Sequence, residues 1–166
     1  MSQQLLENIP ALRRYALSLT GSVHDADDLL QSALERALSR NAPSGDELVK
    51  WLFRVCRNLW IDNYRAAKTR MDAANDPQLE ENSFDGNAQT ENTMMLERVS
   101  TAMNQLHENQ RSILALVAVE GKSYKEVAEL LGIPQGTVMS RLARARSNLN
   151  KILNDGDTRG QVHDNH

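Results

Sequence analysis

Residues 123–146 read SYKEVAELLGIPQGTVMSRLARAR and carry start and stop signals for two short helices joined by a tight turn. Ser123, followed three residues later by Glu126, is a capping box, which marks a helix N-terminus. Gly132 suits the left-handed residue that follows a helix end, and Pro134 suits the start of the next helix. The stretch therefore predicts a helix-turn-helix.

The second of these helices has two different faces. Apolar residues at spacings of three and four predict the buried face, namely Val138, Leu142, Ala145, Leu149 and Ile152. From Gln135 to Lys151 there are four basic residues and no acidic one. The opposite face can therefore approach phosphates and base edges in a major groove, although a solvated helix face is the plainer alternative. The predicted DNA contacts are Gln135, Thr137, Met139, Ser140, Arg141, Ala143, Arg144 and Arg146.

Composition limits the remaining possibilities. The chain has 166 residues, 40% of them hydrophobic, which is enough for one domain or two small ones. Aromatic residues make up only 4%, and no long stretch alternates apolar and polar residues, so a sheet is disfavoured. The absence of a signal pattern or of roughly 18 consecutive apolar residues predicts a cytoplasmic protein. One cysteine, Cys56, and four scattered histidines predict no disulfide, metal site or cofactor.

The first half of the chain has three helical patterns. Residues 2–20 carry an apolar stripe that Pro10 can kink or restart. Ser22 and Asp25 are a second capping pair, and they precede the clearest amphipathic pattern in the chain. Ser44 and Glu47 form a third capping box, after which a helix is predicted to about residue 68. We therefore expect a three-helix module in this half.

The third of these helices is basic. Between Lys50 and Arg70 there are six basic residues and one acidic residue, and aromatic side chains are interleaved with them, namely Trp51, Trp60 and Tyr64. Basic groups that follow a backbone and aromatics that stack on bases are the two ingredients of single-strand binding. An alternative remains open, in which the tryptophans anchor the core and the arginines are solvated.

An acidic stretch separates the two halves. Residues 71–92 hold six acidic residues and no basic one, which predicts a flexible linker. Because the net charge of −3 is unusual for a nucleic-acid binder, the basic faces must be local. We predict an all-α protein of two small helical domains, with residues 1–70 as the first domain, 71–92 as the linker, 93–153 as the second domain and 154–166 as a disordered polar tail.

Two sets of motifs resemble one family. The stretch GIPQGTVMSRL is similar to region 4 of extracytoplasmic-function (ECF) sigma factors of RNA polymerase. The stretches RRYALSLTG, DADDLLQSALERAL and WLFRVCRNLWIDNYRAAKTR resemble region 2 in the same order. RNLWID and GTVMSRLARAR further resemble the alphaproteobacterial general-stress group, which implies a small anti-sigma factor as partner.

The resemblance implies roles for particular residues. It places the second helix on the β′ clamp helices of core RNA polymerase, through Asp27, Asp28, Leu29, Gln31 and Glu35. It places the third helix on the minus-ten element of promoter DNA, through Arg54, Arg57, Asn58, Trp60, Asp62 and Arg65. The helix-turn-helix would read the minus-thirty-five element, and the β flap is the expected polymerase partner of the second domain.

We therefore expect an alternative sigma factor that directs promoter-specific initiation and is not itself an enzyme, because no triad of nucleophile, base and orienting residue and no phosphate loop is visible. The main alternative is a conventional dimeric helix-turn-helix regulator, which would bind duplex DNA tightly without polymerase. A second alternative is a helical interaction protein, such as an anti-sigma factor or scaffold.

Overall fold

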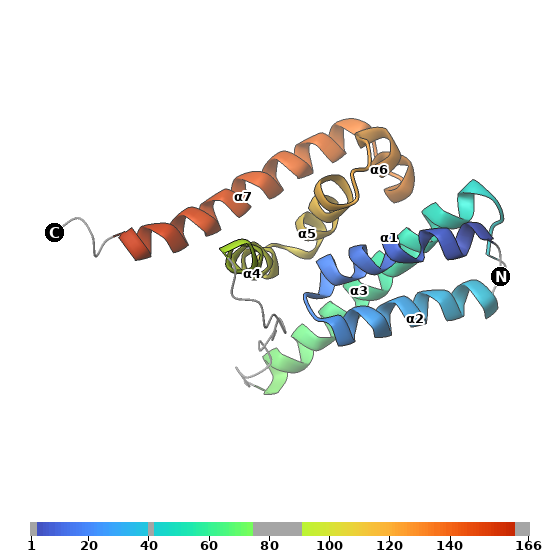
Figure 1. Cartoon of the computed structure of the whole chain (residues 1–166), viewed down its shortest axis with the longest axis horizontal. Helices are drawn as coiled ribbons and strands as arrows, with labels where there is room; N and C mark the ends of the chain where they lie inside the picture. The colour runs from blue at the N-terminus through green and yellow to red at the C-terminus, as the bar shows by residue number, and fades with distance from the viewer. Residues whose placement is uncertain (1–2, 40–41, 75–90, 162–166) are drawn as a thin grey trace.

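The computed structural model describes residues 3–39, 42–74 and 91–161, and within these ranges every regular element is a helix (Figure 1). The first half contains α1 (Gln3–Thr20), α2 (Val23–Ser39) and α3 (Asp46–Ala74). The second half contains α4 (Glu91–Asn104), α5 (Glu108–Leu114), the π-helical turn η1 (Ala115–Val119), α6 (Tyr124–Leu131) and α7 (Gln135–Gln161). The predicted all-α class is confirmed.

The first half is a three-helix bundle in which each helix packs on the other two. α1 continues through Pro10 as a single helix. The Asp25 amide donates to Ser22 Oγ at 3.4 Å, as the second capping pair predicts. Gly45 has a left-handed φ of 72°, and α3 begins directly after it at Asp46 instead of at the predicted Ser44 cap. α3 also extends past residue 68 to Ala74, so residues 71–74 are helical and not linker.

The helix-turn-helix forms as predicted. Ser123 Oγ accepts a hydrogen bond from the Glu126 amide at 3.1 Å, and Gly132 ends α6 with a φ of 68°. α4, α5 and α6 all pack on α7. The apolar stripe of α7 faces them, with Val138, Leu142 and Ala145 at most 2% exposed.

The π-helical turn η1 between α5 and α6 was not predicted from the spacing of apolar residues. The Glu120 amide donates to the Ala115 carbonyl at 3.0 Å, five residues back, so η1 is wider than an α-helix. η1 packs on α1, which brings the second half against the first.

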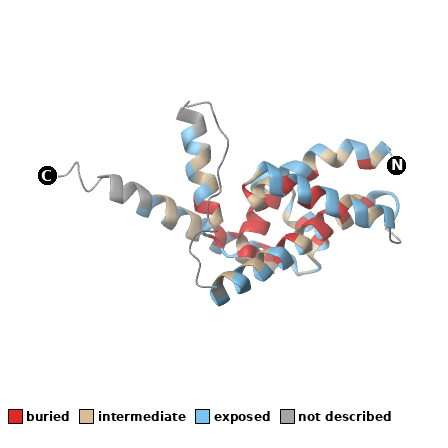
Figure 2. Ribbon diagram, turned by 90° about the horizontal axis from the view of Figure 1, so that it is seen from below, coloured by how far each residue is buried: buried red, intermediate tan, exposed pale blue. Residues whose placement is uncertain are grey.

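The two halves share one continuous core, which lies between them in Figure 2. Tyr15 and Phe53 of the first half and Ile113 and Leu116 of the second half are at most 1% exposed. Cys56 is also fully buried, and burial raises the pKa of its thiol to about 12. The free thiol is therefore an unreactive core residue, as expected.

Two expected boundaries of the second half need correction. Residues 91–92 belong to α4 instead of the linker, and residues 154–161 continue α7 instead of forming a tail. The rest of the linker, 75–90, and of the tail, 162–166, lie outside the described residues. No helix in the described ranges is both long and apolar enough to span a membrane.

Candidate nucleic-acid and polymerase interfaces

α7 presents the predicted duplex-reading face to solvent. Because Val138, Leu142 and Ala145 are buried, the helical repeat turns the intervening residues outward. Thr137 and Arg141 are half-buried at the edges of this face. The remaining predicted contacts are exposed, namely Gln135, Met139, Ser140, Ala143, Arg144 and Arg146.

α3 carries the predicted minus-ten residues, but several of its basic side chains bind the second half of the chain. Arg57 donates from Nε to Ser112 Oγ at 3.0 Å and from Nη2 to Asn109 Oδ1 at 2.8 Å. Arg65 Nε lies 2.9 Å from Glu108 Oε1. Sequence reasoning did not identify these three acceptors, which all lie on α5, because nothing in the polar run HENQRS distinguishes it from an ordinary helix start.

The contact between α5 and α3 keeps the Glu108 carboxylate in its charged form. Burial would raise the pKa of Glu108, but the hydrogen bonds from Arg65 and from the backbone amide of Glu108 itself, with the charges of His107 and Arg65, leave the pKa below its usual value. Burial lowers the pKa of Arg57, and the nearby Arg141 and Arg65 lower it further. Glu108 is therefore ionised at neutral pH and faces a cationic surface.

The N-terminal part of α3 contacts α6 in a similar way. Arg54 Nε donates to the Leu130 carbonyl at 2.7 Å, and Lys50 Nζ pairs with Glu129 Oε2 at 2.9 Å. The Leu130 carbonyl belongs to the last turn of α6, where carbonyls lack helical partners and the helix dipole attracts cations.

Trp60, a predicted base-stacking residue, is covered in this structure. It is 6% exposed, its ring centroid lies 5.6 Å from that of Tyr64, and the Arg111 guanidinium carbon lies 5.8 Å from the ring centroid of Trp60. Arg111 also donates from Nε to the Ser18 carbonyl in the last turn of α1 at 2.9 Å. In this conformation no base can reach the Trp60 ring. Of the other predicted minus-ten residues, Asn58 and Asp62 are exposed.

α2 presents an acidic, solvent-exposed face. Asp27 pairs with Arg13 at 3.2 Å, His24 Nε2 lies 3.5 Å from Asp28, and Gln31 donates to Glu35 at 3.5 Å. The other predicted polymerase contact, Leu29, is 4% exposed and packs in the core. The Leu29 side chain stabilises the bundle and, contrary to the prediction, is not part of the outer face of α2.

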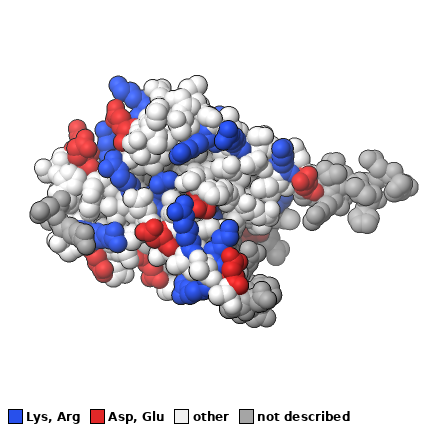
Figure 3. Space-filling model, turned by 180° about the vertical axis from the view of Figure 1, so that it is seen from behind, with Lys and Arg blue, Asp and Glu red and all other residues white. Residues whose placement is uncertain are grey.

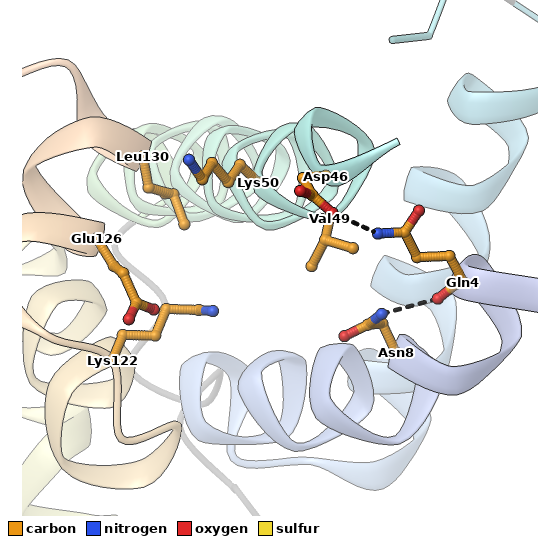
Figure 4. A pocket seen from close by; sticks show the side chains of 8 residues that line it. All are labelled: Gln4, Asn8, Asp46, Val49, Lys50, Lys122, Glu126 and Leu130. Atoms are coloured by element: carbon orange, nitrogen blue, oxygen red, sulfur yellow. Dashed lines mark hydrogen bonds between the residues drawn. The ribbon is translucent and has the colours of Figure 1, made fainter. Parts of the chain in front are cut away.

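A small cavity of about 250 Å³ lies where α1, α3 and α6 meet (Figure 4). Lys122 points into it, the Lys50 side chain lines it on the way to Glu129, and Asp46 accepts a hydrogen bond from Gln4 at 3.2 Å. Val49 of the first half and Leu130 of the second half supply its apolar wall, so the cavity lies between the two halves.

Basic and acidic side chains are intermingled over the face of the molecule in Figure 3. A freestanding nucleic-acid binder instead usually has one extended basic surface. The candidate DNA faces are therefore local stripes on single helices, as the net charge of −3 requires.

The comparisons with known proteins match these two halves separately. Residues 5–57 match the family model of the sigma2 domain of PhyR, and residues 96–149 match sigma-70 region 4. Over 155 residues the chain is 35% identical to the ECF RNA polymerase sigma factor EcfG of Rhodopseudomonas palustris, covering 92% of this chain and 84% of EcfG. The chain belongs to the ECF family of RNA polymerase sigma factors.

Other relatives support the same assignment. This sigma factor is 33% identical over 147 residues to SigM of Bacillus subtilis, covering 86% of this chain and 88% of SigM. Its fold matches that of the sigma factor RpoE of Bartonella quintana, solved in complex with the anti-sigma factor NepR, with a TM-score of 0.66 and 28% identity over 92% and 95% of the two chains. The matches to EcfG and PhyR confirm the resemblance to the general-stress group.

Family membership also decides between the alternatives. An ECF sigma factor acts in transcription initiation, so the dimeric regulator and the scaffold are not favoured. The predicted order of region 2 before region 4 is confirmed.

Proposed function

We propose that this sigma factor recognises the minus-thirty-five element through the exposed face of α7. The division of that helix into a buried apolar stripe and an exposed basic face is the observation that carries the proposal. Ser140, Ala143 and Arg144 lie on the exposed face, where a helix seated in a major groove meets base edges. Arg146 would contact the phosphate backbone beside it.

The minus-ten element would bind along α3. Arg54, Arg57 and Arg65 supply a stripe of cations for a strand backbone, and Asn58 and Asp62 supply hydrogen-bonding groups between them. Trp60 would offer a stacking surface once Arg111 has moved away.

Core polymerase would bind the first half through the exposed α2 residues Asp27, Asp28, Gln31 and Glu35. We assign this role to residues 1–70 and the minus-thirty-five role to residues 93–153, which would also dock on the β flap. Because polymerase would hold both halves at once, each weak DNA contact would gain from a raised effective concentration. We assign no enzymatic activity to this cytoplasmic factor, and the polymerase supplies the chemistry.

A small anti-sigma factor is the proposed negative regulator. The RpoE structure that this chain resembles was solved with the anti-sigma factor NepR. The match to the sigma2 domain of PhyR supports the same type of control, because a PhyR of Bartonella quintana was also solved with NepR.

Run-off transcription with purified core polymerase on a promoter library tests this proposal. We expect initiation that depends on the protein and shares a two-part motif. The absence of initiation, together with tight duplex binding by the protein alone, would contradict the proposal and favour a conventional regulator.

A further inference from the structure

α5 covers the part of α3 to which the proposed function assigns minus-ten binding. Arg57 and Arg65 are eight residues apart, about two helical turns, and therefore share one side of α3. Both are bound to the first two turns of α5, through Ser112, Asn109 and Glu108, at distances of 2.8–3.0 Å.

The acceptors on α5 are of the kinds that a nucleic acid strand offers. The Glu108 carboxylate, only 9% exposed, is an anion set against an arginine, as a backbone phosphate would be. The amide and hydroxyl oxygens of Asn109 and Ser112 are neutral acceptors, like those of bases and sugars. Arg65 is 61% exposed, but a strand that takes the place of these acceptors on Arg57 and Arg65 must displace α5.

Each half of the chain contributes one arginine that donates a hydrogen bond to a backbone carbonyl of the other half. Arg54 of the first half binds the Leu130 carbonyl in the last turn of α6, and Arg111 of the second half binds the Ser18 carbonyl in the last turn of α1. Each arginine therefore caps the C-terminus of a helix in the other half, where the helix dipole favours a cation. The second cap also places Arg111 over Trp60.

The contact made by Arg111 is also partly unfavourable, because it buries a cation. Arg111 is 5% exposed, and burial lowers its pKa to about 10. Its described partners are a carbonyl and an aromatic ring, which do not neutralise its charge. Separation of the halves returns Arg111 to water. Because burying a cation is unfavourable, its rehydration offsets part of the free energy lost with the contacts between the halves.

We infer that the second half is an intramolecular inhibitor of the minus-ten face, in which α5 occupies Arg57 and Arg65 and covers Trp60 until the two halves separate. The inference rests on the proposed function, because it assumes that α3 binds single-stranded DNA. Apart from Thr137 and Arg141, which are half-buried, the duplex-reading residues of α7 are exposed in the same structure, so the inhibition falls mainly on the minus-ten face.

The variant Glu108→Gln/Asn109→Ala tests the inference without altering α3. The probe is a pool of fluorescein-labelled 12-nucleotide DNA strands of random sequence, and the readout is fluorescence anisotropy of the free protein. We expect roughly fivefold tighter binding or more, because apparent affinity rises with the fraction of molecules that are open. Asp155→Asn/Asn150→Ala is the matched control, since it removes the same groups from exposed positions on α7.

Trp60 provides an independent readout of opening. In a Trp51→Phe background, iodide quenching of the remaining tryptophan should increase in the Glu108→Gln/Asn109→Ala variant and stay unchanged in the control. Glu129→Gln, which releases Lys50 from a different element, should shift both readouts in the same direction by a smaller amount. Circular dichroism checks that each variant remains helical.

The two readouts separate the possible failures. If Trp60 stays protected and strand binding stays within twofold of wild type while run-off transcription succeeds, the inhibition is wrong and the proposed function survives. If Trp60 becomes accessible but strand binding does not rise, α3 is not a single-strand face, and both proposals fail.

Discussion

Arg144 is the residue on which the proposed duplex recognition should depend most. It is exposed on α7, and its guanidinium can form two hydrogen bonds to one guanine. Arg144→Ala should therefore weaken recognition at one minus-thirty-five position by about 1–3 kcal/mol. Binding to duplexes with single base changes measures this effect, and Lys151→Ala, seven residues further along α7, is the control. An equal loss on every sequence would mean that Arg144 contacts only phosphate.

Asn58 is exposed on α3 beside Arg57, whose Nη1 donates to Asn58 Oδ1 at 3.3 Å. Asn58→Ala should leave closed promoter complexes intact and reduce melting about 2- to 10-fold, the range for one lost hydrogen bond. Permanganate reactivity of the minus-ten thymines reports melting. Asn63→Ala, also exposed on α3, should behave like wild type; unchanged reactivity with Asn58→Ala would refute the assigned role.

Glu108 should give the closed structure a dependence on acid pH. Its pKa in the folded chain is below the ordinary 4.5, so the unfolded chain binds protons more readily between these two values. Its stabilising contribution is present at neutral pH and is lost as the pH falls from about 4.5 through the folded pKa. Glu108→Gln should remove this part of the acid dependence. The contribution to the free energy of unfolding should be no more than about 1 kcal/mol, because Arg65 is 61% exposed. Urea unfolding at pH 7 and pH 4 measures it; an unchanged difference would contradict the assignment.

At the scale of elements, two glycines near the helix-turn-helix should respond oppositely to the same substitution. Gly132 has a φ of 68°, whereas Gly136 lies in the first turn of α7, and neither position would crowd an added methyl group. Gly132→Ala should lower the free energy of unfolding by about 1–2 kcal/mol, because the left-handed conformation strains alanine. Gly136→Ala should raise it by up to about 1 kcal/mol. Thermal unfolding tests both, and equal signs would contradict the turn geometry.

Local signals explain why the helix-turn-helix could be predicted from sequence. The Ser123 cap, the Gly132 stop and the apolar spacing of α7 each act within a few residues, so they can be identified along the chain. The Ser44 cap was predicted one position early, because Gly45 adopts the left-handed turn that precedes α3. The extension of α3 to Ala74 could not be predicted, since residues 69–74 have no apolar spacing to indicate a helix.

Contacts between the halves have no comparable sequence signature. The basic stripe of α3 was identified as a DNA face, but its pairing with α5 joins residues 43–55 positions apart. Trp60 illustrates the difficulty, because a tryptophan among arginines suits both base stacking and the core. The structure places Trp60 under Arg111. Only the tertiary packing could show which of these two environments the tryptophan occupies.

At the scale of the whole molecule, the sigma factor is one closed unit. Tyr15 and Ser112 form a buried hydrogen bond of 2.9 Å between the halves, and Arg14 pairs at 3.2 Å with Glu120, whose side chain is 2% exposed. Burial raises the pKa of Glu120 despite the hydrogen bond from Arg14 and the charges of Arg14 and Lys122, so this contact is less favourable than an exposed pair. A shared core held by unfavourable polar contacts is consistent with the proposed opening of the two halves on polymerase.

Energy transfer between dyes on the two halves tests this account most directly. Leu38→Cys on α2 and Asn150→Cys on α7 introduce exposed thiols, while the buried Cys56 should remain unlabelled. The account predicts efficient transfer in the free protein and a clear loss of transfer when core polymerase binds. The same transfer efficiency in both states would contradict it, because the minus-ten face of α3 would then remain covered by α5 on the enzyme.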